Sequence, residues 1–234
     1  MRAADEAIVL VGGLGTRLRS VVSDLPKPIA PVAGRPFLAH LLDQVAKAGL
    51  RRVILATGHL AEKVEQAIGL RWAGMEVRYS HEDQPLGTGG AIRLATTQLQ
   101  GGGAHLLNGD TFLRYDLRAL ERLVQAAGVP LGMALAQVPD VERYGAVDIA
   151  AGRVVAFHEK GGHGVGLINA GSYFLTADGV AALPASSSYS FESAVLPEWA
   201  ASGQVVALAD TQDFIDIGVP ADYARAQSLL ATAG

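Results

Sequence analysis

A short apolar run that ends in a glycine-rich turn is the feature that most constrains what this chain can fold into. The run is residues 7–11 (AIVLV), and residues 12–15 (GGLG) follow it directly. Such a run fits a buried strand, and a loop with little side-chain bulk lets backbone N–H groups come close to an anion. Arg17 and Lys27, the latter between two prolines, add positive charge to the same segment. The sequence therefore predicts a phosphate-binding loop at the end of a buried strand.

Apolar segments with the periodicity of strands and of helices alternate through the first half of the chain. We predict strands at residues 8–11, 52–57, 75–79 and 104–107, and helices at residues 37–48, 60–68, 91–99 and 117–127. Strands spaced by helices in this way are typical of a parallel, doubly wound sheet.

After Pro130 the pattern becomes mixed. We expect strands at residues 131–138, 145–149, 153–158, 167–175, 205–208 and 214–217, and helices at residues 191–201 and 220–230. The two strands at residues 145–158 are close enough to form a hairpin. The prediction is one domain over residues 1–234, an α/β fold with a Rossmann-like, doubly wound mixed sheet in three α/β/α layers.

The loops that follow the predicted parallel strands contain the polar and glycine-rich segments. In open α/β sheets, ligands bind outside the carboxyl ends of the strands. These loops hold the first glycine run, Gly58, residues 84–90 and Asp110. We therefore expect four segments that are distant in sequence to form one cleft.

Composition limits the classes of function. About half of the 234 residues are apolar, which suits one unit with a continuous core. The chain has no cysteine, so disulfides and thiolate metal sites are excluded, and no apolar run approaches the ~20 residues of a membrane span. The net charge of −4 does not indicate a nucleic-acid-binding surface. We expect a cytoplasmic protein that binds small molecules, with no membrane or nucleic-acid partner; a homo-oligomer stays open.

Two common phosphate-binding motifs do not match the opening loop. No string fits the Walker pattern, and residues 13–18 (GLGTRL) lack the third glycine of the dinucleotide-binding fingerprint. Instead, residues 12–18 (GGLGTRL) together with residues 26–28 (PKP) resemble the sugar-1-phosphate nucleotidyltransferases, and the likeness covers nearly the whole chain. Val11 stands where alanine is usual in that family.

The resemblance implies a set of binding residues. For the nucleotide it implies Val11, Gly12, Gly13, Gly15, Thr16, Gln84, Gly87 and Thr88; for the sugar phosphate it implies Asn108, Gly145, Glu159, Lys160 and Asn169. It also divides the chain into a nucleotide-binding half, residues 1–129, and a sugar-phosphate-binding half, residues 130–234. Gln84 is expected to hydrogen-bond the base, with nearby glycines leaving room for a flat ring. By themselves, residues 86–90 fit a structural helix start equally well.

The implied catalytic residues are Arg17, Lys27 and Asp110. Arg17 would bind the triphosphate and its leaving group, Lys27 the phosphates, and Lys160 the phosphate of the sugar. Asp110 and Asp216 each close a predicted strand, and carboxylates there can share Mg²⁺, which prefers oxygen ligands. The resemblance implies that they are this metal pair. In the implied reaction the sugar phosphate attacks the α-phosphorus in line, pyrophosphate leaves, and no protein nucleophile is needed.

Other residues near these motifs receive no role. His158 and His163 are expected to be surface histidines, and Glu192 to be a neighbour of a helix cap. Gly161 replaces the proline that usually follows the Glu-Lys pair in the family.

Within the family, the chain most resembles the D-glycero-α-D-manno-heptose 1-phosphate guanylyltransferases. The resemblance lies in the sequences of residues 18–32 and 85–90 and in the compact ending after Asp216. Those enzymes make GDP-heptose for bacterial surface polysaccharides. Nothing in residues 84–90 distinguishes guanine from uracil or thymine, so a uridylyl- or thymidylyltransferase acting on a hexose or amino-sugar 1-phosphate stays the alternative. A non-catalytic module that binds nucleotide sugars is a third possibility. The joint presence of Arg17, Lys27, Asp110 and Asp216 favours the enzyme.

Overall fold

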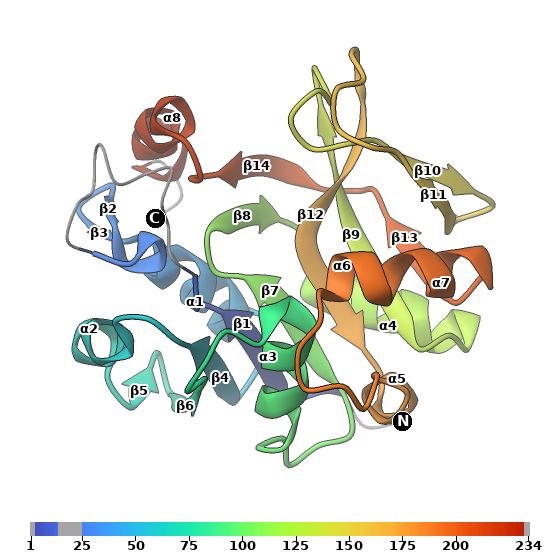
Figure 1. Cartoon of the computed structure of the whole chain (residues 1–234). Helices are drawn as coiled ribbons and strands as arrows, with labels where there is room; N and C mark the ends of the chain where they lie inside the picture. Colours follow the sequence, from blue (N-terminus) through green and yellow to red (C-terminus); the bar gives the residue numbers. More distant parts are fainter. Residues whose placement is uncertain (1–2, 14–24, 232–234) are drawn as a thin grey trace.

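A ten-stranded sheet forms the centre of the molecule (Figure 1). The computed structural model describes residues 3–13 and 25–231. The strands lie in the order β10-β11-β13-β9-β12-β7-β1-β4-β6-β5. Along the chain they are β1 (Glu6–Leu10), β4 (Arg52–Thr57), β5 (Arg71–Trp72), β6 (Met75–His81), β7 (Ala104–Asn108), β9 (Leu131–Val138), β10 (Val147–Ala150), β11 (Arg153–Phe157), β12 (Gly166–Leu175) and β13 (Val205–Leu208). Two small sheets pair β2 (Pro31–Val32) with β3 (Arg35–Pro36), and β8 (Thr111–Arg114) with β14 (Gln212–Asp216).

Helices cover both faces of the sheet (Figure 1). They are α1 (Phe37–Lys47), α2 (Ala61–Ile68), α3 (Gly87–Thr96), α4 (Leu117–Ala127), α5 (Ala177–Ala181), α6 (Phe191–Ala194), α7 (Leu196–Ala201) and α8 (Pro220–Ala231), with a short 3₁₀ helix η2 (Lys27–Ile29). One hydrophobic core contains apolar residues of α1, α2, α4 and α8, and the other contains those of α3, α6 and α7. The predicted three-layer α/β/α architecture is confirmed.

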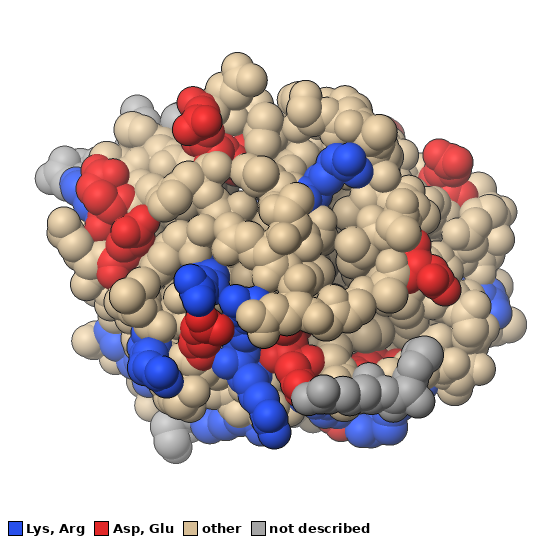
Figure 2. All heavy atoms as spheres, turned by 90° about the horizontal axis from the view of Figure 1, so that it is seen from below, with Lys and Arg blue, Asp and Glu red and all other residues tan. Residues whose placement is uncertain are grey.

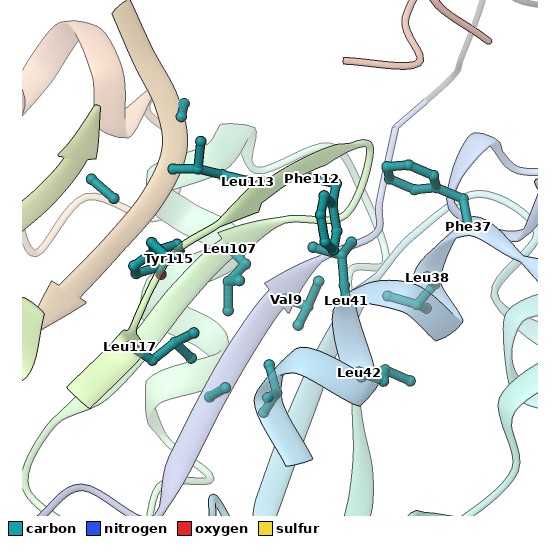
Figure 3. Packing of buried hydrophobic residues seen from close by; sticks show 14 of the residues in the cluster. Val9, Phe37, Leu38, Leu41, Leu42, Leu107, Phe112, Leu113, Tyr115 and Leu117 are labelled. Atoms are coloured by element: carbon teal, nitrogen blue, oxygen red, sulfur yellow. The ribbon is translucent and has the colours of Figure 1, made fainter. Parts of the chain in front are cut away.

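Strand β1 is buried on both faces, which explains its unbroken apolar sequence. Val9 belongs to the core on the α1 side, while the adjacent Ile8 belongs to the core on the α3 side, and neither is exposed. Figure 3 shows Val9 and Leu107 facing the apolar side of α1. Burying one such side chain stabilises the fold by about 1.5–3 kcal/mol.

The winding of the sheet places a crevice at the carboxyl end of β1. Strands β6, β4, β1 and β7 are parallel, and β1 lies between β4 and β7. The chain therefore moves away from β1 through β4 and β6 and returns to its other side at β7, which is the usual position of a ligand crevice. Strand β12 is antiparallel to both β7 and β9, so the sheet is mixed, as predicted.

Two predicted helices differ from the structure by more than one residue. The helix expected at residues 91–99 begins at Gly87, because Gly89 N–H donates to the carbonyl of Tyr189 and extends the first turn (2.9 Å). The helix expected at residues 191–201 is split into α6 and α7. Pro197, in the first turn of α7, has no N–H to continue the hydrogen bonding of α6. Strand β8 was not predicted at all.

Charged side chains of both signs are mixed on the face seen from below in Figure 2, where Lys and Arg lie beside Asp and Glu. This face gives no sign of a continuous basic surface. Within residues 3–13 and 25–231, no helix has the length and apolar character needed to cross a membrane.

A histidine is fully buried near the amino end of β7. His105 has no exposed surface, and its Nε2 lies 3.7 Å from Glu121 Oε2 of α4, beyond hydrogen-bond distance. Burial lowers the pKa of His105, and the neighbouring Glu121 only partly offsets this effect. The folded state therefore keeps His105 neutral at a pH where the unfolded chain would protonate it.

We predict that His105 makes the protein less stable in mild acid. Its pKa is about 6.5 when unfolded and lower when folded, so the stabilisation is present above pH 6.5 and is lost as the pH falls below it. The free energy of unfolding, measured with urea, should fall between pH 7.5 and pH 5.5, and it should fall less for His105→Leu than for the wild type. The two proteins should differ in this loss by roughly 1.4 kcal/mol per pH unit at most. Equal slopes for the two proteins would contradict the prediction.

Candidate active site

Two adjacent cavities open at the carboxyl ends of the parallel strands. The smaller, of about 230 Å³, is lined by Leu10, Val11, Gly12, Gly13, Lys27, Pro28, Thr88, Asn108 and Asp110. The larger, of about 610 Å³, is lined by Leu10, Gly12, Gly13, Ala56, Gly58, His59, Glu82, Asp83, Gln84, Pro85, Gly87, Thr88 and Ala91. They share residues of the first glycine loop. The expected convergence of the four loops on one cleft is therefore confirmed.

The start of the glycine loop is tied to the neighbouring strand. The N–H groups of Val11 and Gly12 both donate to the carbonyl of Ala56 at the end of β4 (2.9 Å each). These two N–H groups are thus already used within the protein. An anion bound at this loop would therefore need other donors.

Three of the predicted site residues on this loop, Gly15, Thr16 and Arg17, lie outside the described residues. The part of the loop whose chemistry the sequence indicated most directly is therefore not placed, and their roles stay predictions.

Lys27 and Asp110 meet at the smaller cavity. Pro26 and Pro28 fix the backbone of η2 around Lys27, whose Nζ lies 3.5 Å from Asp110 Oδ2. Gly109, just before Asp110, donates its N–H to Leu10 O (2.8 Å), and a Cβ there would lie 2.6 Å from that oxygen. Only glycine fits at this position, so it sets the approach of Asp110 to β1.

Pairing of β8 with β14 brings Asp216 beside Asp110. In this ladder Asp216 is opposite Thr111, and the N–H of Ile217 donates to the carbonyl of Asp110 (3.0 Å). Two carboxylates separated by more than a hundred residues in sequence therefore become neighbours, as the predicted metal pair requires.

The environment of Asp216 disfavours its charge. Burial raises the pKa of Asp216, and the negative charge of Asp110 raises it further. A hydrogen bond from the N–H of Gly218 (2.7 Å) and the charges of Lys27 and Arg143 oppose these effects only in part. Two neighbouring carboxylates that repel each other in this way are suited to hold a divalent cation such as Mg²⁺.

Arg143 and Asp222 form an ion pair near this centre that the sequence analysis did not identify. Arg143 Nη1 donates to Asp222 Oδ2, and this bond raises the pKa of the guanidinium. The pair joins the loop before Gly145 to α8, which follows Asp216. Arg143 lies two residues before Gly145, but its partner Asp222 could be found only in the fold.

Some of the predicted sugar-phosphate residues come together at the bulge of β12. Asn169 donates to the hydroxyl of Tyr173 (2.7 Å) and accepts from the N–H of Gly171 (2.9 Å). Gly171 has φ +67°, and a Cβ there would lie 2.5 Å from Nδ2 of Asn108. Asn108, which also lines the smaller cavity, thus contacts the segment that carries Asn169.

The other predicted sugar-phosphate residues lie around β10 and β11. Gly145 has φ +81°, and a Cβ there would lie 2.3 Å from the carbonyl oxygen of His158. Glu159 and Lys160 are exposed, with no hydrogen bond or ion pair to the rest of the described chain, so the structure does not join them to the other site residues. His158 pairs with Asp148 (2.7 Å).

The histidine predictions can be checked directly. His158 and His163 are both exposed surface residues, as predicted, and His163 lies 3.5 Å from Asp140.

Packing explains the glycines of residues 87–90. A Cβ on Gly89 would lie 2.1 Å from the ring of Tyr189, and one on Gly87 would lie 2.5 Å from the carbonyl oxygen of the same residue. The side chain of Tyr189, and not open space for a base, therefore accounts for the missing side chain at Gly89. Gln84 is exposed where it lines the larger cavity, so its contact with a base stays a prediction.

Thr88 links the two halves of the chain. Its hydroxyl donates to Glu192 and accepts from the N–H of Phe191 (2.9 Å). Ser190, the N-cap of α6, also donates to Glu192 (3.0 Å). Glu192 is thus next to a cap, as predicted, and in addition ties α3 to α6.

We predict that Asp216→Asn stabilises the ligand-free protein. Asparagine keeps an oxygen for the N–H of Gly218 but removes the charge that burial and Asp110 disfavour. Thermal unfolding in EDTA at pH 7 should show a higher Tm, by about 2–4 °C for each kcal/mol of repulsion relieved. Asp210→Asn, at an exposed position, is the matched control and should leave the Tm unchanged. A lower Tm for Asp216→Asn would contradict the prediction.

Comparison with known proteins gives the family of the chain. The chain is 41% identical over 225 residues to the D-glycero-alpha-D-manno-heptose 1-phosphate guanylyltransferase of Aneurinibacillus thermoaerophilus, covering 96% of this chain and 98% of that one. Identity to the Campylobacter jejuni subsp. jejuni protein of the same name is 39%, over 93% and 96% of the two chains. The crystal structure of HddC from Yersinia pseudotuberculosis has a TM-score of 0.83 and 34% identity, over 95% and 98% of the chains; that of HddC complexed with GMP-PN has a TM-score of 0.82. The nucleotidyl transferase family model matches residues 6–233, and the chain belongs to this family.

Proposed function

We propose that this chain transfers the GMP unit of GTP to D-glycero-α-D-manno-heptose 1-phosphate, giving GDP-heptose and pyrophosphate. The observation that carries the proposal is the double cavity, in which Lys27 and Asp110 line one part and an uncharged glycine-rich wall joins it to the other. The names of the relatives that match almost the full length of the chain support the same substrates.

In this reaction an oxygen of the sugar 1-phosphate attacks the α-phosphorus of GTP. A new P–O bond forms, the bond from the α-phosphorus to the bridging oxygen breaks, and pyrophosphate leaves with the electron pair. Lys27, at the smaller cavity, neutralises phosphate charge, and Arg17 is proposed to hold the leaving group. Positioning and charge neutralisation account for the rate, since no covalent intermediate is needed.

Asp110 and Asp216 are proposed to hold Mg²⁺. Burial and the negative charge of Asp110 raise the pKa of Asp216, and a divalent cation held by both carboxylates would offset this repulsion. When bound, such an ion polarises the phosphoryl oxygens and offsets their charge. Lys27 Nζ lies 3.5 Å from Asp110 Oδ2 and offsets part of the negative charge of this carboxylate.

The division of the chain into a nucleotide half, residues 1–129, and a sugar-phosphate half, residues 130–234, is part of the proposal. Glu159 and Lys160 are exposed in the structure, so we propose that they reach the sugar phosphate from the rim of the second half. The product would serve surface polysaccharide synthesis. A chain without cysteine that uses nucleotides supports a cytoplasmic location.

We predict that the protein releases pyrophosphate from GTP when the heptose 1-phosphate and Mg²⁺ are present. The assay compares pyrophosphate release for five nucleoside triphosphates, each combined with the 1-phosphates of heptose, mannose and glucose. Lys27→Ala should lower kcat/KM by about 10²–10³ because a charge that stabilises the transition state is lost. Lys47→Ala, on the exposed end of α1, is the matched control and should keep wild-type activity.

Other results of the pyrophosphate-release assay would favour one of the alternative functions. Preference for UTP or dTTP with a hexose phosphate would favour the alternative nucleotidyltransferase. No turnover with any pair would favour the non-catalytic module, and full activity of Lys27→Ala would contradict the assigned role of this lysine.

A further inference from the structure

The first turn of α3 lies against both cavities of the candidate active site. It consists of residues 87–90 (GTGG), and among the described residues Thr88 is the only one with a polar side chain that lines both cavities. Three of these four residues are glycine, which leaves the backbone more conformational freedom than any other residue does. The side chain of Thr88 is therefore the only one through which this turn can be held.

The hydroxyl of Thr88 is used within the protein. It donates its proton to Oε2 of Glu192, and it accepts a hydrogen bond from the N–H of Phe191 (2.9 Å). A hydroxyl has one proton to donate. Because that proton goes to Glu192, the hydroxyl has none left to donate to a phosphate oxygen in the cavity. Its role in this structure is to attach α3 to α6.

Capping of α6 does not depend on Glu192. Ser190 is the N-cap, and its hydroxyl oxygen accepts a hydrogen bond from the N–H of Ser193 (3.2 Å). The same hydroxyl donates to Oε2 of Glu192 (3.0 Å). One carboxylate oxygen therefore accepts hydrogen bonds from two hydroxyls, one in α3 and one at the start of α6. Hydrogen bonds to a charged acceptor are stronger than those between neutral groups.

Backbone hydrogen bonds run along the same contact. The N–H of Tyr189 donates to the carbonyl of Leu86 (3.0 Å), and the carbonyl of Tyr189 accepts from the N–H of Gly89 (2.9 Å). The segment that leads into α6 is thus bonded to α3 on both sides of Thr88. This segment belongs to residues 130–234, so a wall of the nucleotide cavities is held by the other half of the chain.

We propose that Glu192 is a positioning residue for nucleotidyl transfer: acting through the hydroxyl of Thr88, it fixes the first turn of α3 at the wall of both cavities. The inference rests on the proposed function and adds a residue that does not itself touch the substrates. The glycines of the turn make this anchor necessary, because without it the backbone would have to be ordered when the nucleotide binds.

A double-mutant cycle in the pyrophosphate-release assay tests whether Glu192 acts through Thr88. Glu192→Ala and Thr88→Val, which removes the hydroxyl and keeps the shape, should each lower kcat/KM for GTP by about 5–20-fold, mainly through KM. The KM for the sugar 1-phosphate should stay within about twofold in both. The double variant should be no more than about twofold worse than Thr88→Val, because the second change removes the same contact.

The charge of Glu192 is tested by Glu192→Gln, whose amide oxygen can still accept from the two hydroxyls. This variant should keep kcat/KM within about threefold of the wild type. Glu198→Ala, at an exposed position of α7, is the matched control and should keep wild-type kinetics.

Losses that multiply in the double variant would show that Glu192 acts independently of Thr88 and would overturn the proposal. A loss in Glu192→Gln as large as that in Glu192→Ala would overturn it as well. If the wild type turns over no triphosphate, the proposed function fails, and amide hydrogen exchange then decides the role of Glu192 separately. The N–H groups of Gly89 and Phe191 should exchange about tenfold faster in Glu192→Ala and at the wild-type rate in Glu192→Gln; equal rates in all three proteins would contradict the anchor.

Discussion

The two-sided burial of β1 is the constraint on which the rest of the structure depends. Ala7, Ile8 and Val9 have no exposed surface, and their side chains divide between the two cores. A strand buried in this way needs a hydrogen-bonded neighbour on each side and helices that cover it above and below. These neighbours, β4 and β7, end in the loops that form the cleft. The position of the site is therefore a consequence of how the central strand is buried.

The cleft contains carboxylates in positions that are electrostatically unfavourable. Asp216 lies beside Asp110 even though burial and the charge of Asp110 both disfavour its ionised form, and Glu82 keeps an oxygen without a hydrogen bond from the described chain. In a protein interior such arrangements reduce stability, and they are retained where a ligand relieves them. The two acidic features have different chemistry: a close pair of carboxylates suits a cation, and a single oriented carboxylate accepts hydrogen bonds. Lys27 lies beside the pair at the smaller cavity, whereas Glu82 and Asp83 line the larger one.

Much of the fold could be predicted from the periodicity of single segments. The strands at residues 52–57, 131–138 and 205–208 and the helix at residues 117–127 have the limits that the apolar pattern indicated. The helix predicted at residues 191–201 is divided by Pro197, a signal in the local sequence, but other predictions were wrong where a contact distant in sequence decided the outcome. Helix α3 begins earlier because Tyr189 supplies an acceptor, and β8 exists because β14 pairs with it. No local pattern carries information about such partners.

For the site, the sequence by itself determined the family: the glycine loop and Lys27 between prolines carry the resemblance to the nucleotidyltransferases. Tertiary structure alone decided which of these groups meet. The β8–β14 pairing sets Asp216 beside Asp110, and the extension of β6 along β4 turns Glu82 toward Gly12. The physical reason is the separation in sequence between the groups that interact. Strand and helix periodicity follows from neighbours in the chain, whereas charge repulsion and hydrogen bonding between side chains depend on distances that only the packed sheet fixes.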